Sequence, residues 1–181
     1  MRKRIGRALS ATILAGVVML LMALADPGPD LRAQGSTAGP PTVVATGAAS
    51  GPVALLADPV EVPLRPTEAA PAAMERGTRI FLVLDGVRAD DQPGILYAVH
   101  LVPPAGTRPS EGQGAGGRVG TLNFFAAVEA TRTYSYDVTD TMKTLGLRRA
   151  IADGATVVFV PSGIPATDSA PQVARVTLVA Q

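Results

Sequence analysis

The segment RIFLVLDGVRADDQPGILYAVHLV, residues 79–102, decides the fold class of this chain. It contains two apolar runs, 79–87 and 96–102, and the residues between them include Asp, Gly and Pro, which are typical of turns. Residues 80–84 are apolar on both faces of an extended chain, as residues 157–160 are, which is expected of strands inside a sheet. Residues 79–102 therefore predict two strands separated by a turn.

Six more short apolar runs follow the same pattern, with Gly, Pro and Asp between them. They lie at residues 53–56, 60–64, 119–124, 133–138, 156–160 and 173–180. Short runs at this spacing are typical of antiparallel β-sandwiches. The chain is therefore predicted to be mostly β, an antiparallel β-sandwich of seven to eight strands with one short helix.

The helix is expected just after residue 138. Thr139 or Asp140 can cap its first turn, because a short polar side chain can accept a hydrogen bond from a free backbone N–H. The helix would continue through Met142, and Gly146 can end it. A second Ala-rich stretch, residues 67–76, is interrupted by Pro71, so any helix there is short.

The N-terminal segment resembles an export signal in its layout. Residues 1–25, MRKRIGRALSATILAGVVMLLMALA, place four basic residues ahead of an uncharged run. We expect a signal peptide or an uncleaved signal anchor helix, since the run is close to the minimum that spans a bilayer. Residues 26–42 are rich in Pro, Gly and Ala and predict a flexible linker, which leaves 43–181 for the sandwich domain. The expected location is periplasmic, extracellular or on the outer face of the cytoplasmic membrane.

The composition argues against several kinds of chemistry. The chain has no Cys and a single His, His100, so it has no disulfide, no thiolate zinc site and no set of histidine ligands. We expect no cofactor. Without residues 1–25 the chain keeps 12 basic and 15 acidic residues, a net charge of −3, and no basic stripe for nucleic acid.

The segments from residue 79 onward resemble a known family. RIFLVLDGVRADDQPGILYAVHLVPPAG, VGTLNFFAAV, YSYDVTDTMKTL and ATVVFVPSGIPATDSAPQVARVTLVAQ occur in the order seen in the C-terminal β-sandwich domain of bacterial tyrosinase and polyphenol oxidase-like proteins. That domain is related to the one named after the KFDV motif of plant polyphenol oxidases. The likeness is strongest over 79–181, and Ala98 stands where the plant motif has its aspartate.

In that family the sandwich accompanies a dicopper domain held by six histidines and covers the active-site entrance in latent enzymes. A chain with His100 alone cannot supply such a centre. The resemblance therefore implies a non-catalytic, exported accessory domain that binds a partner protein such as a separately encoded copper oxidase. The alternative is a structural or carbohydrate-binding module of the cell envelope, because sandwich domains often present loops to glycans.

Asp85, Asp90 and Asp91 are weak metal candidates. Carboxylates and turn carbonyls suit Ca²⁺, but the spacing matches no known calcium loop, and turn formation explains these residues as well. A hydrolase that uses this turn is a third hypothesis.

Three more residues are candidates for a recognition surface: Tyr134, Tyr136 and His100. Filling the core is the alternative for the two tyrosines, and a solvated strand position is the alternative for His100. No catalytic residue is assigned, because no Ser lies in a G-x-S-x-G elbow. Asp137 and Asp140 could form a carboxylate pair, although helix capping explains them equally well.

Overall fold

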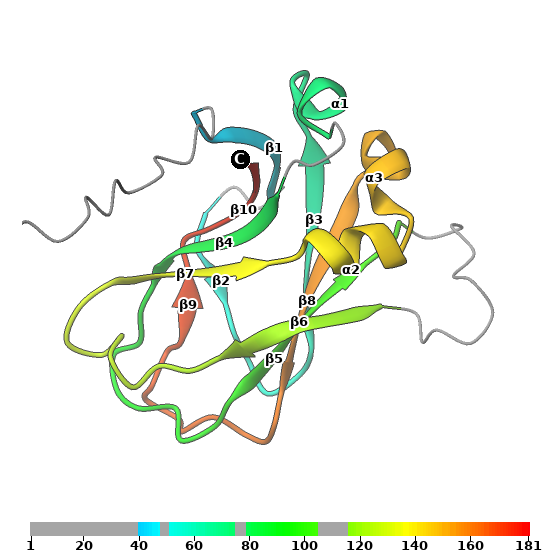
Figure 1. Ribbon diagram of the computed structural model, residues 1–181. Helices are drawn as coiled ribbons and strands as arrows, with labels where there is room; N and C mark the ends of the chain where they lie inside the picture. Colours follow the sequence, from blue (N-terminus) through cyan, green and yellow to red (C-terminus); the bar gives the residue numbers. More distant parts are fainter. Residues whose placement is uncertain (1–39, 48–50, 75–78, 105–115) are drawn as a thin grey trace, which may run out of the picture. The chain divides into compact units, whose positions relative to one another are not determined.

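The computed structural model describes residues 40–47, 51–74, 79–104 and 116–181, all within the compact unit Ala38–Gln181 (Figure 1). The strands are β1 Thr42–Gly47, β2 Val53–Ala54, β3 Val60–Pro66, β4 Ile80–Val87, β5 Tyr97–Val102, β6 Gly117–Leu122, β7 Arg132–Asp137, β8 Ala155–Pro161, β9 Gln172–Val173 and β10 Arg175–Ala180. The helices are α1 Ala70–Ala73, α2 Thr139–Thr144, α3 Leu147–Ala150 and the 3-10 turn η1 Ile151–Asp153. The predicted mostly β, antiparallel class is confirmed. The predicted signal or anchor and the linker up to residue 39 lie outside the described residues.

Eight strands form one antiparallel sheet in the order β6-β5-β8-β3-β1-β10-β4-β7, and β2 pairs with β9 alone. The sheet folds over, so that the β4, β7 and β10 half runs at an angle to the β3, β5, β6 and β8 half (Figure 1). Side chains from the inner faces of both halves form one hydrophobic core. The two layers of the sandwich are therefore made by one continuous sheet.

Strand alternation explains how the core is filled. Throughout β5, in residues 80–84 of β4 and in residues 155–159 of β8, every second residue is buried, because successive side chains of a strand point to opposite faces. Val99 and Phe159 are paired in register and are both fully buried. The ring of Tyr97 meets the ring of Phe124 edge to face with centroids 5.9 Å apart, and the Tyr97 hydroxyl donates to the Leu55 carbonyl at 3.1 Å. Among the residues that the structure describes, Tyr97 is the largest fully buried side chain.

The two ends of the sheet order, β6 and β7, meet at a seam. Tyr136 of β7 donates its hydroxyl to the Thr121 carbonyl at 3.0 Å, and Tyr134 donates to the Asn123 carbonyl at 2.9 Å. Gly120 of β6 lies against the Tyr136 ring, where a Cβ atom would meet the ring carbons. Hydroxyl groups of β7 therefore bond to backbone carbonyls in β6 and just after its end. We call these contacts the tyrosine seam.

The helices lie together at one end of the sheet, which we call the helix end. The helix predicted to run through Met142 is present as α2, which begins at Thr139, and Gly146, with φ of +69°, follows it in a conformation that favours glycine. The helix of the Ala-rich stretch 67–76, α1, is short, as expected, and α3 and η1 are present in addition. The predicted cap was wrong, since neither Thr139 nor Asp140 caps α2 and the carboxylate of Asp137 accepts from the Thr139 N–H instead.

The opposite end of the sheet carries only loops, and we call it the loop end. Its four segments connect β2 to β3, β4 to β5, β6 to β7 and β8 to β9, and they are residues 55–59, 88–96, 123–131 and 162–171. In Figure 1 they lie along the left and bottom of the picture. Over the part of the chain that is described, no helix is long and apolar enough to cross a bilayer.

Candidate functional site

The loops of the loop end are tied to one another by hydrogen bonds. The Asp90 N–H donates to the Ser169 carbonyl at 2.8 Å, and the Ala166 N–H donates to the Pro93 carbonyl at 3.0 Å. The side-chain amide of Gln92 donates to the carbonyls of Phe124 and Phe125 at 3.3 and 3.2 Å. Three loops that are far apart in sequence are therefore held in one arrangement.

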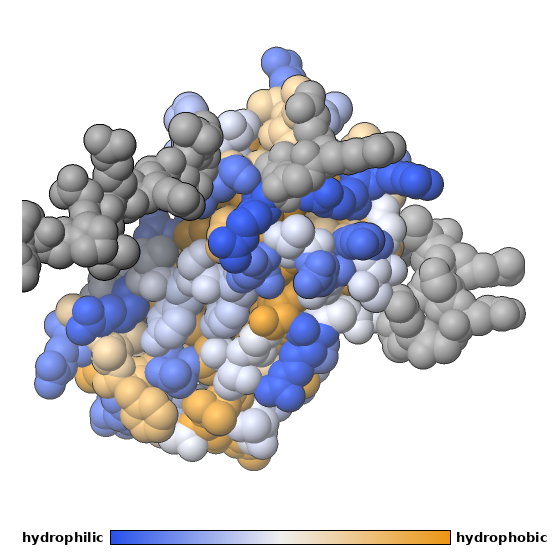
Figure 2. Space-filling model, viewed as in Figure 1, coloured by the Kyte–Doolittle hydropathy of each residue, from blue (hydrophilic) through white to orange (hydrophobic). Residues whose placement is uncertain are grey.

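Large apolar side chains protrude from these loops. The exposed fractions are 83% for Ile164, 77% for Phe125, 61% for Leu56 and 43% for Leu96. Of the large hydrophobic residues that are exposed in the described segments, only Val43 on β1 lies elsewhere. Figure 2 shows apolar residues at the lower margin of the molecule, where Figure 1 places the loop end. Apolar side chains gathered on one end of a domain are typical of an interaction surface.

The same loops are acidic. They contain five exposed carboxylates and one basic residue, Arg88; the carboxylates are those of Asp58, Asp90, Asp91, Glu129 and Asp168. The Arg88 guanidinium faces the side-chain amide of Gln172. Arg132, which begins β7, donates to the Ala126 carbonyl at 2.8 Å. The loop end therefore combines protruding apolar groups with a surplus of negative charge.

The predicted metal candidates lie in and beside this end. The Asp85 carboxylate, on β4, accepts a hydrogen bond from the Thr133 hydroxyl at 2.7 Å. Asp90 and Asp91 lie in the next loop, and the Asp91 carboxylate accepts from the Gln92 N–H at 2.6 Å. Within the described segments, no three His, Asp or Glu side chains come together in a group that could hold a metal ion. The Asp91 contact is that of a turn-forming residue, whereas the Asp85 contact joins β4 to β7.

The predicted recognition pair, Tyr134 and Tyr136, forms the tyrosine seam. Both side chains are half-buried, and their strand partners in β4 are the buried residues Leu84 and Leu82. Burial, and then the neighbouring Tyr134, raise the pKa of Tyr136 to about 12. The contacts seen in the structure close the core at the sheet edge, and a recognition role for the pair stays a prediction.

His100 lies half-buried on the outer face of β5. Its register partners are Val158 of β8 and Arg118 of β6. The Arg118 guanidinium donates to the Thr121 hydroxyl at 2.8 Å. The structure therefore places His100 away from the loop end and apart from Tyr134 and Tyr136, which point inward, so the three candidates do not form one surface.

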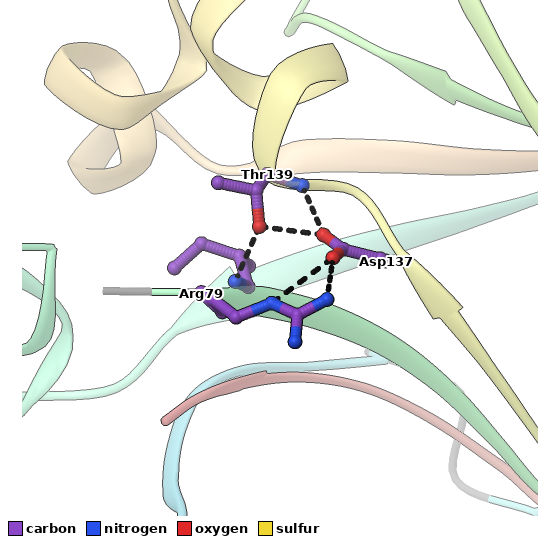
Figure 3. A network of polar contacts seen from close by, with 4 residues as sticks. Arg79, Asp137 and Thr139 are labelled. Carbon is purple, nitrogen blue, oxygen red and sulfur yellow. Dashed lines mark hydrogen bonds and ion pairs between the residues drawn. The ribbon is translucent and has the colours of Figure 1, made fainter. Parts of the chain in front are cut away.

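A network of polar contacts lies at the start of α2 (Figure 3). The Asp137 carboxylate accepts from the Thr139 hydroxyl at 2.6 Å and from its N–H at 3.0 Å, and it pairs with Arg79 at 2.5 Å. The Thr139 hydroxyl also accepts from the Ile80 N–H at 2.9 Å. The pKa of Asp137 is lowered to about 2 by these contacts. The largest contribution comes from the hydrogen bond of the Thr139 hydroxyl, and the next from the hydrogen bond of Arg79. The contacts of Asp137 therefore connect β7 to α2 and to the start of β4.

We expect Asp137→Ala to lower the free energy of unfolding by about 1 kcal/mol at pH 7, the usual net contribution of an intramolecular hydrogen bond. Because the folded-state pKa lies below the ordinary 3.8, the stability that this carboxylate contributes is present above that value and is lost as the pH falls towards 2. The difference from the wild type should therefore shrink between about pH 5 and pH 2. Urea unfolding at several pH values measures it.

Asp137→Asn is the matched control for this prediction. It keeps an acceptor for the Thr139 N–H and removes the charge that pairs with Arg79. Its loss of stability at neutral pH should be smaller than that of Asp137→Ala. A carboxyl titration of Asp137 by NMR with a midpoint near 4 would contradict the assignment.

The sequence did not single out the exposed apolar residues of the loop end. Phe124 and Phe125 are adjacent in NFFAAV, and only the fold buries the first and exposes the second. Ile164 lies between Gly163 and Pro165. The sequence signal that could have indicated exposure of Ile164 is a large apolar residue inside a Gly- and Pro-rich turn, because turns lie at the surface and seldom bury their side chains.

Comparison with known proteins finds no family model that matches this chain, and no curated protein matches it.

Proposed function

We propose that this protein is an exported, non-catalytic accessory domain that binds a partner protein through its loop end. The partner class suggested by the sequence resemblance is a copper oxidase of the tyrosinase type, encoded separately. The observation that carries the proposal is the exposure of Phe125 and Ile164, at 77% and 83%, on loops that hydrogen bonds hold in place. Large apolar groups on a fixed frame lose little freedom when they are buried by a partner.

The test is a binding and latency measurement with the full chain. A tyrosinase-type oxidase from the same organism is mixed with the protein, and the affinity and the oxidase activity are recorded. We expect binding and a lowered oxidase activity. Phe125→Ser combined with Ile164→Ser should weaken binding about hundredfold, because buried apolar anchors carry most of the energy of an interface.

Val43→Ser is the matched control, since Val43 is also apolar and is 42% exposed, but lies on β1. It should leave both measurements unchanged. If the oxidase neither binds nor changes in activity, and a pull-down from the native envelope recovers no partner, the proposal is wrong.

Carbohydrate binding is a second candidate, and the exposed ring of Phe125 favours it. An exposed aromatic ring can stack on the apolar face of a sugar, and the described tyrosines are half-buried or buried. Affinity electrophoresis in gels that contain cell-wall polysaccharide would reveal it. Retardation of the wild-type chain that is lost in Phe125→Ala and kept in Val43→Ser would favour the glycan over the protein partner.

A further inference from the structure

We propose that the loop end docks on an apolar depression of a partner protein whose border carries lysine or arginine side chains. This inference rests on the proposed binding function and adds the chemistry of the partner surface. It follows from two features that lie on the same four loops: protruding apolar side chains and a surplus of carboxylates.

The apolar side chains are presented by a frame that is already ordered. Gln92 ties its loop to the backbone at Phe125, and the bond from the Ala166 N–H to the Pro93 carbonyl fixes the loop that carries Ile164. Phe125 and Ile164 protrude, so they fit a concave partner surface. Anchors of this kind contribute most when a partner pocket excludes water from them.

The carboxylates of the loop end favour a partner pocket with positively charged residues around it. Asp90, Asp91 and Asp168 lie close to one another in the chain fold, because the N–H groups of Asp90 and Asp91 both face the carbonyl of Ser169. Asp58 and Glu129, on the other two loops, are also exposed. Opposite charges around the contact speed encounter and exclude wrong partners. A cationic border is therefore the complement of this surface.

The same charges disfavour other occupants. Anionic headgroups give a membrane surface a negative potential, which would repel the loop end. A symmetric dimer through the loop end would bring the five carboxylates of each copy against those of the other, because such an interface uses the same patch twice. A protein with basic residues around an apolar pocket meets neither obstacle.

The test is photo-crosslinking of the full chain in its native host. p-Benzoylphenylalanine replaces Phe125, Ile164 or, as the control position, Val43, and the adducts are identified by mass spectrometry. We expect the first two positions to give adducts with one protein, at a segment that contains apolar and Lys or Arg residues. Val43 should give none with that protein.

Variants that remove the loop-end carboxylates test the cationic border separately from the proposed function. Asp90→Asn, Asp91→Asn and Asp168→Asn together should lower the adduct yield about tenfold, since each exposed charge pair contributes a factor of a few. Added salt should lower the wild-type yield in the same direction. The matched control is Glu61→Gln, Glu68→Gln and Asp153→Asn, three exposed carboxylates outside the loop end, and its yield should equal that of the wild type.

Each result of the crosslinking experiment supports or contradicts a specific claim. If the chain is crosslinked to a protein and the three Asp→Asn substitutions do not change the adduct yield, the inference of a cationic border is wrong and the proposed function still stands. Adducts with lipid, with glycan or with a second copy of the chain overturn the protein partner. A chain that keeps its circular dichroism spectrum but gives no adduct from Phe125 or Ile164 overturns both this inference and the proposed function.

Discussion

Replacing Tyr97 with Ala is expected to lower the free energy of unfolding by about 3–5 kcal/mol, the usual cost of removing a buried aromatic ring. Tyr97 is fully buried, packs edge to face on Phe124, and donates its hydroxyl to the Leu55 carbonyl. The substitution therefore opens a cavity between β5 and the loop end and leaves a carbonyl without its donor. Urea unfolding followed by far-UV circular dichroism measures the change.

Tyr97→Phe separates the ring from the hydroxyl. It keeps the edge-to-face contact with Phe124 and removes only the bond to Leu55, so it should cost about 1 kcal/mol. If Tyr97→Phe were as harmful as Tyr97→Ala, the hydrogen bond and not the packing would hold this part of the core. If neither variant changed the unfolding midpoint, the buried position of Tyr97 would be wrong.

Gly120→Val has the second largest expected effect. Its side chain would overlap the Tyr136 ring, and the ring cannot move aside without stretching the bond from its hydroxyl to the Thr121 carbonyl. We expect a loss of about 1–3 kcal/mol, the usual cost of overpacking. The pKa of Tyr136, raised to about 12 in the wild type, should fall towards its ordinary value of 10 as the ring becomes solvated.

Two variants isolate the seam contact. Gly51→Ala is the matched control, because a Cβ atom at Gly51 meets nothing within 4 Å, and it should be close to neutral. In a chain that already carries Tyr136→Ala, Gly120→Val should cost clearly less than it does alone, since the overlap is gone. Equal costs with and without the Tyr136 ring would show that the seam does not depend on this contact. Ultraviolet titration of the tyrosines and urea unfolding give the two readouts.

The sequence predicted the strands well where hydrophobic runs are long and bounded by turn residues. Residues 79–87 and 96–102 are close to β4 and β5, and 156–160 lies inside β8. β1 was not among the eight predicted runs, because TVVATG is short and follows a Pro- and Gly-rich stretch. Its pairing with β10 on one side and β3 on the other makes it a strand.

The helix end was predicted less completely. The start of α2 at Thr139 and the role of Gly146 follow from local signals, namely a polar residue before an apolar one and a glycine after the last turn. The bonds of Asp137 follow only in part: helix capping was one interpretation of this residue in the sequence, whereas its pairing with Arg79, 58 residues earlier in the chain, needs the fold. α3 and η1 follow at once, without a sequence signal strong enough to predict them.

The amino-acid sequence by itself determined that the described part of this protein is an antiparallel β domain, because alternation and turn residues act over a few neighbouring positions. Only the tertiary structure decided which side chains of that domain are free to bind. Phe124 and Phe125 have the same side chain and adjacent positions, and one is 2% exposed while the other is 77% exposed. The burial of Phe124 and the exposure of Phe125 depend on how four loops, distant in sequence, pack at the end of the sheet.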